Sequence, residues 1–259
     1  MTSDRYFLEV TYKGTEYSGF QKQENANTVQ AEIEKALTVL QKKSIELTGS
    51  SRTDAGVHAL QNFFHFDYDD EIHPQFLYKI NAILPLDIVV VKITKVKKEA
   101  HCRFSASSRA YKYYLSQKKS PFLQDRAFYF PYSIDLKTMN EAAKIVTNYR
   151  DFSSFAKRRS QVKTFDCRID CSEWTRNDDV LVYYVKANRF LRGMVRGLTG
   201  TMLQVGRGKI SLAEFEAIIM ARDCTKANFA VPGKGLFLVE VQYPDSIFHE
   251  PGNSFQPIQ

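Results

Sequence analysis

Two kinds of hydrophobic periodicity alternate along the whole of this 259-residue chain. In some short segments apolar or aromatic residues recur at every second position, the pattern of a strand with one buried face. In others they recur every three or four positions, which predicts a short amphipathic helix. The expected strands are 6–12, 64–68, 88–96, 110–116, 167–174, 180–187 and 236–243, and the expected helices are 29–40, 74–84, 136–146, 189–204 and one that begins after residue 211.

Capping chemistry places several of the helix ends. Asn27 and Asp135 each precede a helical pattern and are expected as N-caps. Ser211 and Glu214 have the spacing of a capping box, in which each side chain satisfies the other's backbone N–H. Gly206 is expected to end the long helix that begins near residue 189.

Strands and helices mix in a similar way on both sides of residue 106. We therefore expect an N-terminal α+β domain over 1–106 and a C-terminal α+β domain over 107–245, related in build. Residues 246–259, with two prolines and a glycine, are expected to form a flexible tail. Antiparallel sheets backed by helices on one face are the expected architecture.

The charge balance favours a polyanionic partner but does not require one. Lysine and arginine outnumber aspartate and glutamate by 36 to 29, a net charge of +7. An excess of this size suits nucleic acid, and it equally suits a mildly basic protein with no such partner. The 19 phenylalanines and 14 tyrosines exclude a disordered chain, because they supply a sizeable core.

Targeting and redox signals point to the cytoplasm. No apolar run approaches the length of a membrane span, and the first residues carry Asp4 in place of an apolar signal core. Of the four cysteines only Cys167 and Cys171 lie close in sequence, and neither a second pair nor a nearby histidine completes a zinc set. Four reduced thiols are therefore expected.

The most informative segment is the loop at 50–60, SSRTDAGVHAL. Arg52 lies two residues from Asp54 and can orient that carboxylate and favour its ionised form, while Gly56 permits a sharp turn. The alternative is that Asp54 caps an Asx turn, the commoner use of a loop aspartate. His58 is expected to be a structural hydrogen-bonding residue rather than an acid or base, because no catalytic partner adjoins it.

Two further segments combine basic and apolar or aromatic side chains. Residues 103–114 interleave arginine and lysine with aromatic rings, which suits phosphates and stacked bases, or else a strand with ordinary core tyrosines. In the predicted helix 189–204, Arg189, Arg192 and Arg196 fall on one face, as in a solvated amphipathic helix or a binding stripe.

That helix also contains three glycines, which destabilise helices and are explained if another backbone or a substrate approaches closely. They are Gly193, Gly197 and Gly200. Two other basic patches, 95–98 and 157–159, suit phosphate contacts or solvated loops.

The sequence lacks the common signatures of cofactor-dependent chemistry. It has no phosphate-binding loop of the G-x-x-x-x-G-K-[ST] type, no dinucleotide-binding G-x-G-x-x-G after a strand, no zinc-binding H-E-x-x-H and no G-x-S-x-G nucleophile elbow. No cofactor is therefore expected.

Six blocks of sequence, spread in order over nearly the whole chain, form a specific set. They are 17–21 with 28–30, 51–59 (SRTDAGVHA), 84–88, 103–106 with 109–113, 152–155, and 190–196 (FLRGMVR). This set resembles the motifs of the tRNA pseudouridine synthase A (TruA) family. Departures lie at flanking positions: Ser51 in place of glycine, 100–102 in place of F-H-A, and Val231 and Lys234 in the block before Leu236.

The resemblance implies a fold, a reaction and a set of site residues. The fold is two α+β domains that share a largely antiparallel sheet, with the active site in the cleft between them. The reaction is the isomerisation of flipped uridines at positions 38–40 of the tRNA anticodon stem-loop, by a homodimer with no cofactor. The catalytic residues are Asp54, Tyr111, which stacks on the base, and Arg196, which pairs with the aspartate. The expected substrate-binding residues are Arg52, Phe20, Gln21, Arg109 and Leu236.

Two other functions compete with this one. A non-catalytic tRNA-binding or chaperone module would use the same basic surface without needing Asp54 or Arg196. A nucleoside or sugar hydrolase also needs a carboxylate near a glycosidic bond. Such enzymes mostly use a pair of carboxylates, and Asp54 has no acidic neighbour in its loop.

Overall fold

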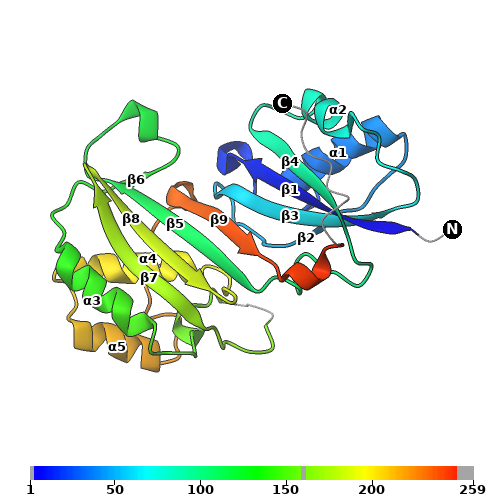
Figure 1. Ribbon diagram of the computed structural model, residues 1–259. Coiled ribbons are helices and arrows are strands. Elements are labelled where there is room, and N and C mark those ends of the chain that lie inside the picture. Colours follow the sequence, from blue (N-terminus) through cyan, green and yellow to red (C-terminus); the bar gives the residue numbers. More distant parts are fainter. Residues whose placement is uncertain (1–2, 159–161, 250–259) are drawn as a thin grey trace. The chain divides into compact units, whose positions relative to one another are not determined.

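The structure is a computed structural model that describes residues 3–158 and 162–249. Contacts divide the chain into two compact units, the first running to Ser107 and resuming at Leu238, the second running from Ser108 to Phe237. Each unit combines helices with a mostly antiparallel sheet (Figure 1). The expected domain limits assigned 238–245 to the second half, whereas the contacts group those residues with the first unit.

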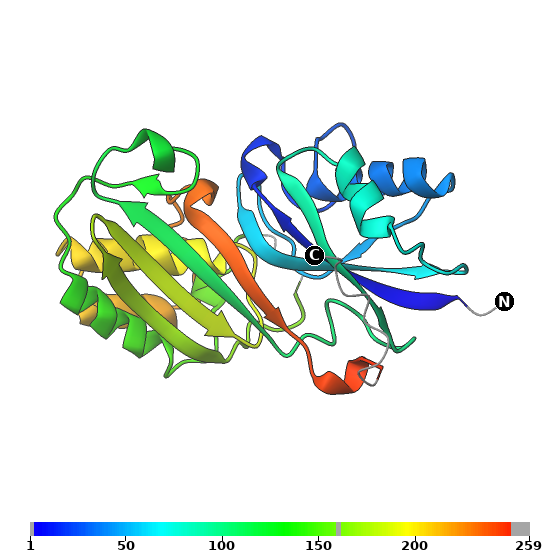
Figure 2. The ribbon, with the colours of Figure 1, turned by 45° about the horizontal axis from the view of Figure 1, so that its top comes forward.

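The first unit is built around strand β1 (Asp4–Tyr12). It pairs antiparallel with β3 (His58–Tyr68) on one side and β4 (Ile88–Val96) on the other, with Leu8 opposite Phe64. The short β2 (Thr48–Gly49) also pairs with β3, and β9 (Leu236–Gln242) follows β3 in the strand order. Helices α1 (Val29–Gln41) and α2 (Phe76–Ile83) lie together on one face of this sheet (Figure 2).

The second unit is built around the antiparallel strands β5 (Ser108–Ser116), β8 (Val180–Ala187) and β7 (Ile169–Asn177), in that order. A two-residue strand, β6 (Phe128–Tyr129), runs parallel to β5. Helices α3 (Leu136–Val146), α4 (Met194–Gly206) and α5 (Leu212–Met220) pack together and against the sheet. The expectation of α+β units with mostly antiparallel sheets and helices on one face is confirmed.

Short 3₁₀ helices and the chain end complete the described structure. The 3₁₀ helices are Gly14–Glu16, Pro121–Leu123, Ser153–Phe155, Gly233–Gly235 and Asp245–Ile247. The expected tail at 246–259 is described only as far as His249, and in that part the Lys97 N–H donates to the Ile247 carbonyl at 2.9 Å. No helix in the described ranges is both long and apolar enough to cross a membrane.

Two of the three predicted N-caps are confirmed. The Asp135 carboxylate accepts from the Lys137 and Thr138 backbone N–H groups, and Ser211 with Glu214 forms the expected capping box. The prediction for Asn27 is wrong, because Thr28 caps α1 with a hydroxyl that accepts from the backbone of Ala31 at 3.3 Å. A cap side chain reaches the N–H two or three residues on, and Thr28 is the residue in the extended conformation at that distance.

The start of α4 was predicted five residues too early. Gly193 has φ +77°, in the left-handed region, so the right-handed helix begins only at Met194. Arg189 and Arg192 therefore precede the helix, and the expected stripe of three arginines on one helix face is wrong. Of the three, only Arg196 lies on α4.

The glycines of α4 mark a close approach, as expected. A Cβ built on Gly200 would lie 2.2 Å from the Asn228 carbonyl oxygen, and one on Gly197 would lie 2.8 Å from the Phe229 ring. The Asn228 N–H also donates to the Thr201 hydroxyl at 3.0 Å. The segment 228–231 thus lies against the glycine face of α4.

Gly200→Ala is expected to destabilise the protein, although alanine is the better helix former by about 1 kcal/mol. The new methyl would meet the backbone carbonyl of Asn228, a residue whose N–H donates to the Thr201 hydroxyl, and forced overpacking costs about 1–3 kcal/mol. Urea unfolding followed by circular dichroism measures the effect. A variant more stable than the wild type would contradict the close approach.

Candidate active site

Asp54 lies in the loop that joins β2 to β3 in the first unit. The carboxylate is half-buried, and the neighbouring Arg52 side chain is exposed. The turn is closed by the Val57 N–H, which donates to the Asp54 carbonyl at 3.2 Å. Gly56 has φ +72°, so its place in the turn suits glycine, as expected from the sequence.

A buried asparagine anchors the residues on the N-terminal side of Asp54. Asn62, on β3, is fully buried. Its Nδ2 donates to the Ser51 carbonyl at 2.9 Å and to the Tyr12 hydroxyl at 3.2 Å, while its Oδ1 accepts from the Ser51 N–H at 3.3 Å. The Tyr12 hydroxyl in turn lies 2.8 Å from the Thr53 hydroxyl. Ser51 and Thr53 are thereby fixed on either side of Arg52.

A second segment supports the same loop from outside. The Phe20 N–H donates to the Thr53 carbonyl at 3.1 Å, and the Gly56 N–H donates to the Tyr17 carbonyl at 3.3 Å. Gly19 has φ +113°, and a Cβ there would lie 3.0 Å from the Thr53 oxygen. The glycine of this motif is therefore required by backbone conformation and by close packing on the Asp54 loop.

Phe20 and His58 are both core residues around this loop. The Phe20 ring is 1% exposed and stacks on Phe64 with centroids 4.4 Å apart. His58 is also 1% exposed, and its Nδ1 accepts from the Gly14 N–H at 3.1 Å. The structural role expected for His58 is confirmed.

In the second unit, β5 presents Tyr111 next to Phe190. The Tyr111 side chain is 9% exposed, and the two rings meet edge to face with centroids 5.0 Å apart. Arg109, also on β5, donates from Nη1 to the Asn188 carbonyl at 3.2 Å. Tyr111 is thus almost completely buried, and its ring is oriented by the contact with Phe190.

Arg196 is oriented by the segment that crosses the glycines of α4. Its Nε donates to the Val231 carbonyl at 2.8 Å, and the Tyr113 hydroxyl fixes the same segment by donating to the Pro232 carbonyl at 2.7 Å. Both contacts use backbone oxygens. The departure at Val231 from the family block therefore leaves the acceptor for Arg196 in place. Leu236, at the start of β9, is 7% exposed.

The eight predicted site residues fall into two sets, each positioned within one unit. Asp54, Arg52, Phe20 and Gln21 belong to the first unit, and Tyr111, Arg109, Arg196 and Leu236 belong to the second. The basic and aromatic segment 103–114 is likewise divided between the units after Ser107. Tyr113 within it is completely buried, so the core explanation is confirmed for that tyrosine.

A small pocket adjoins the Asp54 loop in the first unit, and the sequence did not predict it. Its volume is about 300 Å³. It is lined by Phe20, Gln21, Gln30, Leu47, Thr48, Gly49, Arg52, His101, Arg103 and Phe104. Three of these lining residues, Phe20, Gln21 and Arg52, are among the predicted substrate-binding residues, and the arginine beside an aromatic residue at 103–104 is a further signal in the sequence.

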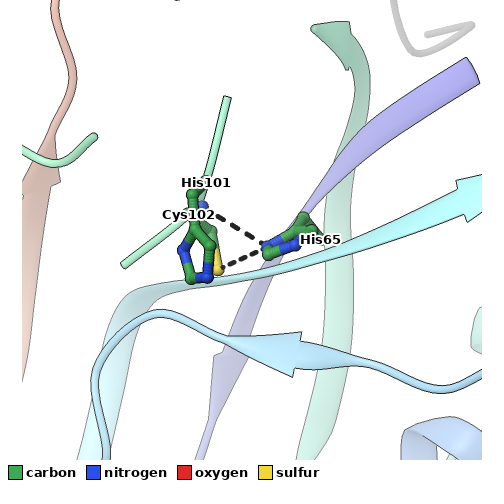
Figure 3. A group of neighbouring side chains, drawn as sticks. All are labelled: His65, His101 and Cys102. Atoms are coloured by element: carbon green, nitrogen blue, oxygen red, sulfur yellow. Dashed lines mark hydrogen bonds between the residues drawn. The ribbon is translucent and has the colours of Figure 1, made fainter. Parts of the chain in front are cut away.

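One group of described residues brings metal-ligand atoms together: His65, His101 and Cys102, whose candidate ligand atoms all lie within 4.8 Å of one another (Figure 3). Cys102 Sγ lies 3.1 Å from both His65 Nδ1 and the Thr48 carbonyl oxygen. Contact with a carbonyl oxygen requires the protonated thiol, whereas metal binding requires the thiolate.

The histidines of this group argue against a metal centre as well. His101 Nδ1 accepts from the backbone N–H groups of Arg103 and Phe104, at 3.1 and 3.4 Å, so the neutral ring carries its proton on Nε2. Burial, and then the charge of Arg5, lowers the pKa of His65 to about 4, so the His65 ring is neutral at neutral pH. The group fits a hydrogen-bonded structural cluster better than it fits a cation site.

Comparison with known proteins decides the family. A family model described as tRNA pseudouridine synthase matches residues 9–105 and 143–244. The chain belongs to the tRNA pseudouridine synthase family. Among curated members, the tRNA pseudouridine synthases A of Parabacteroides distasonis, Bacteroides fragilis and Staphylococcus aureus are 45%, 44% and 34% identical to it. These alignments cover 94%, 96% and 92% of this chain and 98%, 100% and 91% of the relatives.

Asn62→Ala is expected to destabilise this synthase and loosen the Asp54 loop. It removes the partners of the Ser51 N–H and carbonyl and one of the partners of the Tyr12 hydroxyl, and each buried polar group left unsatisfied costs about 1–3 kcal/mol. Urea unfolding measures the loss, and limited proteolysis within 50–57 measures the loosening. Leu60→Ala, an exposed position on the same strand, is the control. Equal stability of the two variants would contradict the anchoring role.

Proposed function

We propose that this chain converts uridine to pseudouridine at positions 38–40 of the tRNA anticodon stem-loop, in the cytoplasm. As a member of its family it is an isomerase. The observation that carries the proposal is Asp54, a half-buried carboxylate on a loop that is anchored on both sides and bears the motif SRTDAGVHA. The target positions rest on the sequence resemblance.

The proposed reaction breaks the bond between C1′ and N1 of uridine and forms one between C1′ and C5. The base turns over in between, and the proton lost from C5 is balanced by one gained at N1. No other atom enters or leaves, so the overall chemistry needs no redox or nucleotide cofactor. Asp54 starts the reaction by attack at C1′ of the sugar or at C6 of the base. A carboxylate on a rigid loop suits either attack, because the loop already holds the carboxylate in one position before the substrate binds.

The other predicted residues are proposed to serve the same uridine. Arg196, whose Nε is fixed by the Val231 carbonyl, pairs with the Asp54 carboxylate. Tyr111 stacks on the flipped base and assists removal of the C5 proton. Arg52 fills the space that the base vacates or holds the phosphate of the flipped nucleotide. Gln21, Arg109 and Leu236, with Phe20 as support, complete the substrate contacts.

The chain is further proposed to act as a homodimer, which the resemblance implies. Light scattering of the purified protein tests this directly. A monomer mass at concentrations where the enzyme turns over would contradict it.

Asp54→Asn is expected to abolish isomerisation while tRNA binding persists. The amide keeps the shape of the side chain but removes the negative charge of the nucleophilic carboxylate, and loss of a nucleophile lowers turnover by more than about 10³-fold. The measurement is tritium release from tRNA labelled at C5 of uridine, with binding followed by filter retention. Full turnover by the variant would exclude Asp54 as the catalytic carboxylate.

The same assay separates the competing functions. Tight binding by the wild type without tritium release would favour the non-catalytic module. Free uracil among the products would favour a hydrolase. Mapping pseudouridine along the product tRNA tests positions 38–40, and modification elsewhere would overturn that part of the proposal alone.

A further inference from the structure

The pocket beside the Asp54 loop has the size of a site for one small group. At about 300 Å³ it lies at the lower limit of small-molecule sites, which suits a single nucleobase better than a larger ligand. Arg52 lines it, whereas Asp54, two residues further on, does not. The pocket therefore adjoins the proposed catalytic carboxylate without containing it.

One wall of the pocket is a pair of aromatic rings, the exposed Phe104 and the half-buried His101. Phe104 is 75% exposed, a large exposed fraction for a phenylalanine. Its ring lies 4.4 Å from that of His101, and the Arg103 guanidinium lies 5.4 Å from the Phe104 centroid. Exposed rings next to arginines are the means by which proteins stack on unpaired RNA bases.

The wall is held in place from beneath. His101 Nδ1 accepts from the backbone N–H groups of Arg103 and Phe104, and the His101 ring packs edge-on against His65 of β3 with centroids 4.6 Å apart. Cys102, completely buried, donates from its thiol to the Thr48 carbonyl of β2, and Figure 3 shows Cys102 beside His65 and His101. A fixed platform binds a base at low entropic cost.

The charges around the pocket suit a phosphate. Two arginines, Arg52 and Arg103, line it, and none of the lining residues is acidic. Gln21 adds an amide that can donate to or accept from a base edge. Aromatic faces for a base and guanidinium groups for its phosphate thus occur together in one small cavity.

We propose that this pocket binds an unpaired nucleotide of the RNA substrate other than the uridine that is isomerised. The base stacks on Phe104 and His101, and the phosphate contacts Arg103, which leaves Arg52 to serve the flipped uridine. This inference rests on the proposed function for its choice of RNA as the occupant. It assigns to the segment 101–104 a role in holding the substrate next to the catalytic loop.

The test uses the full-length protein and an unmodified tRNA transcript. Phe104→Ala is expected to raise Kd and KM roughly 10-fold, the effect of losing one stacked base, with little change in kcat. Phe104→Trp restores most of the affinity, whereas Phe104→Leu, which keeps bulk without a ring, does not. Tyr78→Ala is the matched control, because Tyr78 is 77% exposed on α2 and does not line the pocket.

Two further measurements separate stacking from a general structural effect. Arg103→Ala should lower the slope of log Kd against log salt concentration by about one, as expected for one phosphate contact. Irradiation of the wild-type complex with a transcript containing 4-thiouridine should cross-link the RNA to the tryptic peptide 104–109. Thermal unfolding of each variant confirms that the exposed substitutions leave the fold intact.

The outcomes distinguish the two proposals. Wild-type isomerisation with unchanged Kd and KM in Phe104→Ala overturns the subsite and leaves the proposed function standing. Phe104-dependent tRNA binding without isomerisation by the wild type overturns the proposed function and keeps the subsite. Equal losses of tRNA affinity in Phe104→Ala and Phe104→Trp also overturn the subsite, because a stacking site accepts tryptophan.

Discussion

The buried amide of Asn62 is the interaction on which the catalytic loop depends. A polar side chain with no exposed surface must satisfy its hydrogen bonds inside the protein, and this one does so with the Ser51 backbone and the Tyr12 hydroxyl. The sheet thereby dictates the path of the chain on either side of Arg52. Ser51 and Thr53 are buried by these contacts, whereas Arg52 is exposed and Asp54 is half-exposed. Rigid support and accessible chemistry come from the same network.

The second unit positions its residues by a related device, the close approach of one backbone to another. Glycine at positions 197 and 200 lets residues 228–231 lie against α4, and the Val231 carbonyl then orients Arg196. Contacts made by backbone atoms do not depend on the side chain that carries them. This explains how the block before Leu236 departs from its family at Val231 while the acceptor for Arg196 persists.

The pocket beside the Asp54 loop links the chemistry to the neighbouring turn. Arg52 belongs to both the loop and the pocket, and the His101–Phe104 wall rests on a cluster formed by His65 and Cys102. That cluster brings together atoms that resemble a metal-ligand set, but its hydrogen bonds require a protonated thiol and an Nδ1 that accepts from backbone. In this protonation state the cluster supports the exposed side chains of the pocket wall and does not suit a metal ion.

The sequence by itself determined the family, the α+β class, the strand 88–96 and the caps at Asp135 and Ser211, because periodicity, capping and motif spacing are local properties. It anticipated that the glycines of α4 face a close neighbour, but not which one. Only the tertiary structure decided that Gly193 delays α4, that Thr28 and not Asn27 caps α1, and that Asn62 holds the loop before Asp54. The same holds for the pocket, whose walls come from four separated segments. A left-handed φ value and a contact between residues far apart in the chain leave no periodic trace, so they appear only when the chain is folded.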